Sequence, residues 1–312
     1  MWFVHLHGHS QYSLLEGIGS VPNIIAQAQQ LGMSAIAITD YYSMYGALEF
    51  YQKAKKADIQ AIIGVDMPLV HDLSLKTWGF DHLWFVTILC NNRDGYHDLL
   101  KLVSYANTTG YYHKPRVDRA TLSKYHTNLT VLVWGEQWVI GSMITKDLDD
   151  QNISDMIGRL SDTMQWQLII EYCVQDYNLV PLARQINEQV IRLHQQSDYM
   201  ITCSNNYHYI HADDQQPREV ALAIKDQKLY SDRDRRKVVG HYHIMTEAEI
   251  RLVLAWQNVD HDLANLMIDN TSVCAEKLRI IMPVLPAMFP LYDPPEQITS
   301  LYESHKDLLV VQ

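Results

Sequence analysis

Short runs of apolar residues alternate along this chain with longer stretches in which apolar positions recur every three or four residues. The short runs are rich in β-branched residues and are typical of buried strands. There are seven of them: WFVHLH, SAIAITD, AIIGVDMPLV, WFVTILC, LTVLVW, QLIIEYC and YMITCS. The stretches between them have the periodicity of amphipathic helices. Repeated strand-then-helix units predict an α/β protein with a parallel sheet covered by helices, and about seven units favour a barrel.

Local signals mark the ends of two predicted helices. Ser20 can cap a helix after the first strand, with Pro22 in its first turn and Gly32 beyond its last turn. Thr246 and Glu249 match a capping box, in which each side chain bonds the backbone of the other residue. Both helices are therefore predicted from chemistry at their ends as well as from their apolar periodicity.

The pattern changes twice toward the end of the chain. From about residue 211 it becomes mainly helical, which predicts a helical extension after the last strand. From Met282 the segment MPVLPAMFPLYDPPEQ is rich in proline. We therefore expect one domain over residues 1–280 and a linker over residues 281–312 that leads to a further segment.

The composition is that of a soluble globular protein, with 47% hydrophobic and 20% charged residues among 312. A formal net charge of -11 argues against a surface that binds nucleic acid over most of its area. The four cysteines are far apart and form no CxxC pair, which favours buried reduced thiols. No signal peptide or membrane-length apolar run is evident, so we expect a cytoplasmic protein that does not contact a membrane.

Histidines are unusually frequent at the start of the chain, where His5, His7 and His9 alternate. If the first strand persists, these three side chains point the same way and border the mouth of a parallel barrel. Other strand ends carry further polar residues: Asp40, Asp66, Glu171, Asn206 and His208. Convergent histidines and carboxylates are what a divalent-metal hydrolase uses. Each residue taken alone has a plainer interpretation, as a hydrogen-bonded core residue or a helix cap.

Four segments carry a resemblance to a known family: FVHLHGHSQYSLLEG, LGMSAIAITDYYSMYGALEFYQKAKKADIQAIIGVD, NNRDGYHDLLKLVSYA and KPRVDRATL. They resemble the polymerase-and-histidinol-phosphatase (PHP) domain of the bacterial DNA polymerase III α subunit, a C-family replicative polymerase. The resemblance implies a distorted (β/α)7 TIM-like barrel with a helical C-terminal extension. It places the PHP domain at residues 1–280, and palm, fingers and thumb domains would follow the linker.

The resemblance also implies an ancestral site for divalent ions. His7 and His9 match the family's HxH pair, and His208 matches its last histidine. Glu16 stands where the family usually has aspartate, and Asp66 stands where it usually has glutamate. These five residues are the expected metal ligands that remain.

Other ligand positions depart from the family pattern. Tyr41 and Phe85 stand where the family has histidines, and Asn206 stands where it has aspartate. The stretch around Gly135 lacks the expected cysteine or histidine. Phenylalanine cannot ligate, and asparagine offers a neutral oxygen. The loss of several ligands should dismantle a trinuclear cluster, which leaves no ion or one weakly bound Zn²⁺, Mn²⁺ or Mg²⁺.

One basic cluster lies in the segment SDRDRRKVVG, at Arg233, Arg235, Arg236 and Lys237. A solvated loop is the plain interpretation, and a contact with DNA phosphates or with another polymerase domain is the alternative. Asp232 and Asp234 in the same segment are not expected to act as a polymerase metal pair, because they lie in a charged loop.

Three functions remain open. The leading expectation is a scaffold within a DNA-directed DNA polymerase, a nucleotidyltransferase that works in DNA replication, with the palm and thumb as partners. Other replisome subunits could dock on this domain, and DNA would be reached only through the full polymerase. The enzymatic alternative is a metal-dependent phosphoesterase, of the proofreading-exonuclease or pyrophosphatase type. The third is a binding module that keeps the barrel mouth as a pocket.

Overall fold

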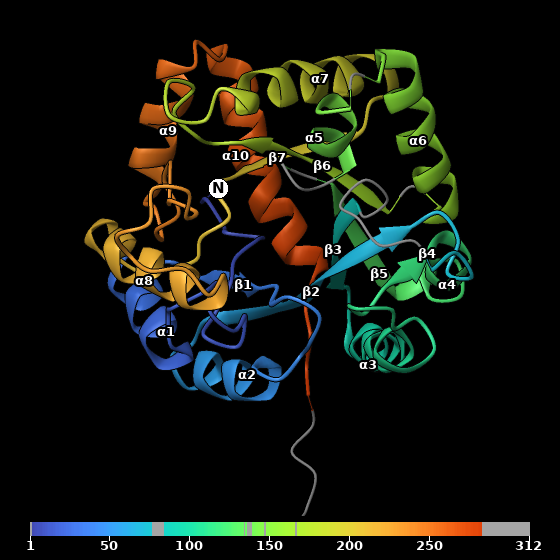
Figure 1. The fold of residues 1–312 in the computed structure, drawn as a ribbon, viewed down its shortest axis with the longest axis horizontal. Helices are drawn as coiled ribbons and strands as arrows, with labels where there is room; N and C mark the ends of the chain where they lie inside the picture. Colours follow the sequence, from blue (N-terminus) through green and yellow to red (C-terminus); the bar gives the residue numbers. More distant parts are fainter. Residues whose placement is uncertain are drawn as a thin grey trace, which may run out of the picture. The chain divides into compact units, whose positions relative to one another are not determined.

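A single curved sheet forms the centre of the domain (Figure 1). The structure is a computed structural model that describes residues 2–76, 84–133, 135, 139–146, 148–165 and 167–282. Its strands are β1 (Ala35–Ile38), β2 (Gln60–Val70), β3 (Trp84–Cys90), β4 (Val117–Asp118), β5 (Leu129–Val133), β6 (Leu168–Cys173) and β7 (Met200–Ser204). They follow the order β1-β2-β3-β5-β6-β7, and the short β4 pairs with β2. Six of the seven predicted strands are therefore present.

Most strand pairs are parallel, but β3 is an exception. β1 pairs with β2, β5 with β6 and β6 with β7 in parallel, as predicted. β3 runs antiparallel to both β2 and β5. No helix lies between β2 and β3 among the described residues, and antiparallel neighbours need no helical crossover. The prediction of a wholly parallel sheet is wrong at this strand.

The seventh predicted strand, WFVHLH, is an extended segment without a regular ladder. The Ala37 N–H donates to the carbonyl of His5 at 2.9 Å, and the Thr39 N–H donates to that of Gly8 at 2.7 Å. On the other side, the His9 N–H donates to the Tyr207 carbonyl at 2.7 Å. The segment therefore lies between β1 and the chain after β7 and closes the ring. The result is a distorted barrel of the expected class.

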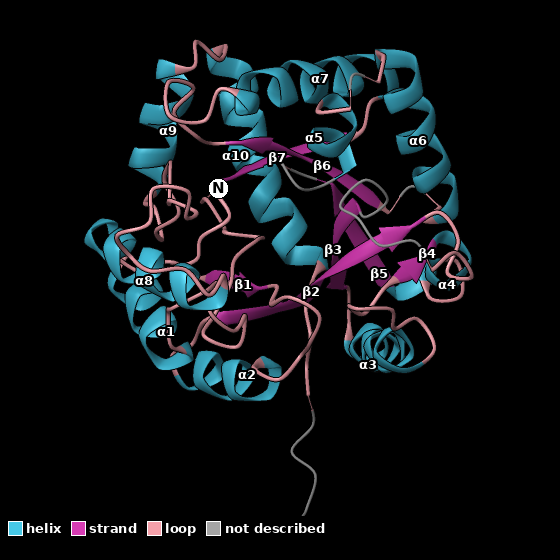
Figure 2. Ribbon diagram, in the orientation of Figure 1, coloured by secondary structure: helices cyan, strands magenta, loops and turns pink. Residues whose placement is uncertain are grey.

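Most of the helices lie around the outside of this barrel, whereas the last one in the chain runs toward its centre (Figure 2). The helices are α1 (Val21–Gln30), α2 (Ala47–Lys56), α3 (Arg93–Thr108), α4 (Arg119–Leu122), α5 (Val139–Ile144), α6 (Asp150–Thr163), α7 (Leu182–Ser197), α8 (Gln215–Lys225), α9 (Glu247–Trp256) and α10 (His261–Lys277). Both predicted caps are confirmed: Ser20 accepts from the N–H of Asn23, and Thr246 and Glu249 form a reciprocal capping box. None of the described helices is both long and apolar enough to cross a membrane.

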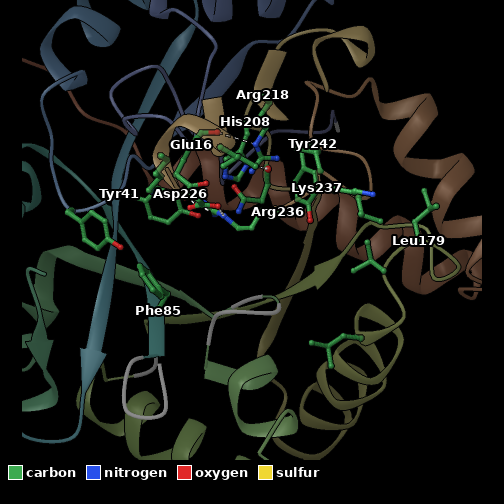
Figure 3. Close-up of a pocket in the computed structure, with 18 of the residues that line it drawn as sticks. Glu16, Tyr41, Phe85, Leu179, His208, Arg218, Asp226, Arg236, Lys237 and Tyr242 are labelled. Carbon is green, nitrogen blue, oxygen red and sulfur yellow. Dashed lines mark hydrogen bonds and ion pairs between the residues drawn. The ribbon is translucent and has the colours of Figure 1, made fainter. Parts of the chain in front are cut away.

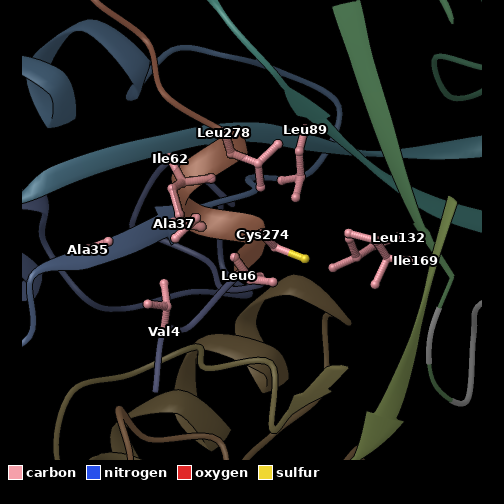
Figure 4. Packing of buried hydrophobic residues seen from close by; sticks show 11 residues of the cluster. Val4, Leu6, Ala35, Ala37, Ile62, Leu89, Leu132, Ile169, Cys274 and Leu278 are labelled. Carbon is pink, nitrogen blue, oxygen red and sulfur yellow. The ribbon is translucent and has the colours of Figure 1, made fainter. Parts of the chain in front are cut away.

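The helical extension ends inside the barrel. The last turns of α10 pack against inward-facing residues of the sheet and the N-terminal segment (Figure 4). The cluster comprises Val4, Leu6, Ala35, Ala37, Ile62, Leu89, Leu132, Ile169, Cys274, Ala275 and Leu278. The Gln60 side chain donates to the carbonyls of Ala275 and Leu278 at 2.5 and 3.2 Å. α10 thus fills one end of the barrel with apolar side chains, and buried polar groups gather at the other end.

The predicted domain boundary lies at the edge of the described structure. Residues up to Ile281 belong to one compact unit, and the predicted domain over residues 1–280 stays a prediction. The predicted linker over residues 281–312 lies outside the described residues beyond Met282, and it stays a prediction. All four cysteines are free and buried, as the sequence indicates.

Candidate functional site

His7 lies at the centre of the barrel mouth between two buried carboxylates. Its Nε2 is 2.9 Å from Oδ2 of Asp66 on β2, and its Nδ1 is 3.0 Å from Oε2 of Glu171 on β6. Burial alone would lower the pKa of His7, but the two carboxylates outweigh it and raise that pKa to about 9. His7 is therefore an imidazolium that donates to a carboxylate through each ring nitrogen.

The pKa values of the two carboxylates shift in opposite directions. Burial would raise the pKa of Asp66, but His7 and His9 outweigh it and lower that pKa to about 2. The Asp66 carboxylate also accepts from the Thr87 hydroxyl at 2.6 Å. For Glu171, burial dominates and raises the pKa, since only His7 opposes it. The charge of His7 is therefore shared mainly with Asp66.

His9 joins this cluster from the same segment. Its Nε2 is 3.1 Å from Oδ2 of Asp66, and its ring stacks on that of Tyr41 with centroids 4.1 Å apart. Its Nδ1 is 3.0 Å from the hydroxyl of Ser13, which itself donates to Asp40 at 2.7 Å. Asp40 thus serves as an anchor for the loop that follows the histidines.

The side chain of His5 turns away from this cluster. Its Nε2 is 2.9 Å from the carbonyl of Met245, and its ring packs edge-on against Phe3 and Tyr207. Burial lowers the pKa of His5 to about 4, so it is neutral. The expectation that all three histidines point the same way depended on a regular strand, and the irregular backbone separates His5 from the others.

The donor atoms of this cluster show whether it could hold a metal ion. Among the described residues, His7, His9 and Asp66 offer ligand atoms within 4.8 Å of one another. Two imidazoles and a carboxylate are a donor set that Zn²⁺ accepts. Oε1 of Glu171 is buried without a hydrogen-bond partner, whereas Nε2 of His9 already lies 3.1 Å from Oδ2 of Asp66. The donor set fits one ion, provided that His7 loses its proton.

Two predicted ligands lie outside this set of three. Glu16 forms ion pairs with Lys225 at 2.6 Å and with Arg236 at 3.1 Å, at the rim of the mouth. His208 stacks near His9 with ring centroids 4.2 Å apart, but its Nδ1 is 2.8 Å from the carbonyl of Asn206. Burial lowers the pKa of His208 well below its usual value, so its ring is neutral.

Tyr41, Phe85 and Asn206, which the resemblance marks as departures from the ligand set, line the same cavity (Figure 3). The rings of Tyr41 and Phe85 meet edge-on with centroids 5.9 Å apart, so these two positions are occupied by aromatic packing. Asn206 adopts the left-handed conformation at φ 50°, and its buried Oδ1 has no hydrogen-bond partner. Asn206 thus places a neutral oxygen at this buried position, where an aspartate would add a negative charge.

The predicted basic cluster does not act as one patch. Arg235 pairs with Glu219 at 2.7 Å and packs over the ring of Tyr230. Arg233 and Arg236 are both exposed, but Arg236 pairs with Glu16 and Asp226. Lys237 lines a cavity of about 750 Å³ at the barrel mouth. Only two of the four residues, Arg236 and Lys237, therefore border the site.

Comparison with known proteins places this arrangement in a family. The model of the PHP domain matches residues 5–173, which is more than half of the chain. The chain belongs to the PHP domain family. A solved amidohydrolase from Chromobacterium violaceum shares 12% identity over 66% of this chain and 87% of its own, with a TM-score of 0.46.

The PHP domain also matches curated relatives of greater length. The DNA polymerase III subunit alpha of Borreliella burgdorferi is 28% identical over 96% of this chain and 26% of its own length. That of Saccharopolyspora erythraea is 27% identical over 89% of this chain and 24% of its own length. The chain thus spans about a quarter of the length of these relatives, and it is homologous to that part of them.

The structure of the PHP domain adds residues that sequence reasoning did not assign to the site. The Thr87 hydroxyl donates a hydrogen bond to the Asp66 carboxylate. In the sequence, the one sign of this role is that Thr87 is a polar residue within an apolar strand. Arg218 on α8 lies at the mouth, buried at 7% exposure, although a lone arginine on a helix gives no sequence signal. The sequence indicates Glu171 only as a strand-end carboxylate, and in the structure its Oε2 lies 3.0 Å from Nδ1 of His7.

Proposed function

We propose that this PHP domain is the N-terminal domain of a DNA polymerase III α subunit and that it acts there mainly as a scaffold. The family match and the polymerase relatives support the first part of this proposal. One observation supports the second: His7, which should bind metal, is instead held between Asp66 and Glu171 in a buried ion network. Such a network stabilises the barrel mouth without an ion.

The surroundings of the network agree with a scaffold. Glu16 forms ion pairs with Lys225 and Arg236, and the rings of Tyr41 and Phe85 pack together where the resemblance implies histidine ligands. In this proposal, nucleotidyl transfer belongs to the palm domain of the full subunit. The partners of this domain are the palm and thumb and other replisome subunits, and DNA is reached through the assembled polymerase in the cytoplasm.

Metal stoichiometry tests the proposal directly. The 312-residue chain is incubated with Mn²⁺ or Zn²⁺, desalted and analysed for metal, with His7→Ala as the comparison. We expect less than one ion per chain in both proteins and no hydrolysis of bis-p-nitrophenyl phosphate. Two or more ions per wild-type chain, lost in His7→Ala, would contradict the scaffold proposal and favour an enzyme.

A second candidate is a phosphoesterase that uses one ion. The proximity of the ligand atoms on His7, His9 and Asp66 favours it. An ion held by these three residues would supply a Lewis acid and an activated water. This candidate predicts Mn²⁺- or Zn²⁺-dependent hydrolysis that His9→Ala abolishes, while the variant His261→Ala, at an exposed histidine, keeps it. Equal rates in the two variants would rule it out.

A further inference from the structure

α9 is apolar on two opposite faces. Its inner face buries Ile250, Val253 and Leu254 against the domain. The residues of α9 that are exposed to solvent are apolar as well: Ala248, Leu252, Ala255 and Trp256. Leu252 is 49% exposed and Trp256 is 63% exposed. A helix at the surface of a soluble domain normally has a polar outer face, and a helix that is apolar all round is typical of one that is covered on both sides.

These four exposed residues form one continuous surface, which we call the outer stripe. Counted from Ala248, they occupy positions i, i+4, i+7 and i+8, which lie on one side of an α-helix. α9 itself lies at the edge of the domain (Figure 1). Single exposed apolar side chains are common on proteins, whereas a contiguous apolar patch with a polar rim is typical of a contact surface.

Polar residues border the outer stripe on both sides and are bonded within the domain. On one side, Glu247 accepts from Nε of Arg251 at 2.8 Å. On the other side, Glu249 accepts from the N–H of Thr246 at 2.7 Å and lies 3.3 Å from Nε2 of His243. These contacts hold the polar side chains at the edges of the helix, so the apolar stripe stays uncovered between them.

The surroundings of the outer stripe are acidic. Residues 247–262 contain four carboxylates and one arginine: Glu247, Glu249, Asp260, Asp262 and Arg251. Asp262 has a fully exposed side chain in the first turn of α10, just after the stripe. A second copy of this chain would bring the same negative charges against this surface, and nucleic-acid phosphates would be repelled by them too. A partner that carries positive charge beside an apolar face is complementary to the stripe.

We propose that the outer stripe of α9 binds an amphipathic helix of a partner protein, with basic residues on either side of that helix's apolar face. Ala248 and Ala255 are small and leave grooves beside Leu252 and Trp256, into which side-chain ridges of a second helix pack. The stripe is roughly 12 Å long, at about 1.5 Å per residue, so about two to three turns of a partner helix cover it. Trp256 is the expected centre of the binding energy, because large aromatic side chains contribute most when a contact buries them.

This inference deepens the scaffold proposal, because it states the chemistry of a partner that the domain holds. The role of the partner rests on that proposal, but the two have separate tests. Metal stoichiometry tests the barrel mouth, and no residue of α9 lines the cavity there. A chain without metal that binds no helix would contradict only this inference, whereas a metal-loaded enzyme would contradict the scaffold proposal.

The affinity for two synthetic peptides tests the inference. Both have leucine at helical spacing: LKKLLKLLKKLLKL carries lysine, and LEELLELLEELLEL carries glutamate. By fluorescence anisotropy with dilute labelled peptide at low ionic strength, we expect one lysine peptide to bind per chain, about tenfold or more tightly than the glutamate peptide. Trp256→Ala should weaken the binding of the lysine peptide about tenfold or more. Tyr45→Ala is the matched control: it removes an aromatic side chain that is 77% exposed and lies outside α9, and it should change the affinity less than about twofold.

Further arms separate the outer stripe from general charge attraction. Asp262→Lys adds positive charge beside the stripe and should weaken binding of the lysine peptide severalfold. Asp155→Lys makes the same change at an exposed residue of α6 and should have a smaller effect. Leu252→Ala replaces Trp256→Ala if that variant does not fold. Equal losses in Trp256→Ala and Tyr45→Ala, equal affinity for the two peptides, equal effects of the two lysine substitutions, or a dimer in sedimentation velocity that Trp256→Ala dissociates would each overturn the inference.

Discussion

At the scale of single residues, the barrel mouth contains a buried network of ion pairs. His7 joins Asp66 and Glu171, and all three side chains are fully buried. Removing one partner of a buried ion pair leaves the other charge without compensation, which costs more than the pair itself contributes. The same residues that suggest a metal site are therefore expected to matter for folding.

Asp66→Asn tests this role of the network. The substitution keeps the volume and removes the charge that faces His7, so the free energy of unfolding should fall by about 3 kcal/mol or more. Urea denaturation measures it. Asp155→Asn, on the exposed face of α6, is the matched control and should change stability by less than about 0.5 kcal/mol. Equal effects of the two substitutions would show that the network contributes nothing.

The cysteines provide a second residue-scale prediction. Burial raises the pKa of Cys274 to about 12 and raises the pKa values of Cys90 and Cys203 further. Since the thiolate is the reactive form, none of these thiols should react with Ellman's reagent at pH 8 in the native protein. All four cysteines should react once the chain is unfolded in guanidinium. A thiol that reacts rapidly in the native protein would contradict this expectation.

At the scale of elements, the ends of helices were predictable and the packing of the last helix was not. The caps of α1 and α9 are local chemistry, and both are confirmed. The extension was expected to be helical, yet nothing in its periodicity indicates that α10 fills the barrel. That position depends on contacts with strands far away in sequence.

Leu278→Ala tests whether α10 stabilises the barrel. Leu278 is 1% exposed among strand residues, so the truncation should cost about 2–4 kcal/mol of unfolding free energy. Leu266→Ala on the same helix is the control, because that side chain is 42% exposed and should lose far less. Thermal and urea unfolding both measure the difference. If the two variants lose similar stability, the end of α10 is not part of the core.

Strand direction and the structure of the first segment could not be predicted from local sequence patterns. Apolar runs indicated the strands, but an apolar run has no direction, and β3 runs opposite to its neighbours. The segment with His5, His7 and His9 alternates like a strand, yet it closes the ring by a few bonds to β1 and to Tyr207. The family resemblance supplied the candidate ligands, whereas the partners of Glu16 lie about 200 residues away and follow from tertiary packing alone.

At the scale of the whole molecule, charge is distributed unevenly. Acidic residues dominate the chain, but cations from α8 and the segment after it gather at the barrel mouth. Glu16 connects the loop after the histidines to Lys225 and Arg236 on that side. Glu16 therefore holds these cations in place and cancels part of their charge.

Glu16→Gln tests whether these ion pairs stabilise the barrel mouth. The substitution keeps the shape of the side chain but removes the charge that faces Lys225 and Arg236, so the free energy of unfolding should fall by about 1 kcal/mol. The loss should shrink as salt is added, because these charges border solvent. Glu188→Gln, at an exposed carboxylate on α7 paired with Arg192, is the control and should change stability by less than about 0.5 kcal/mol. If urea denaturation gives equal losses for the two variants, the connection between the loop after the histidines and α8 does not stabilise the domain.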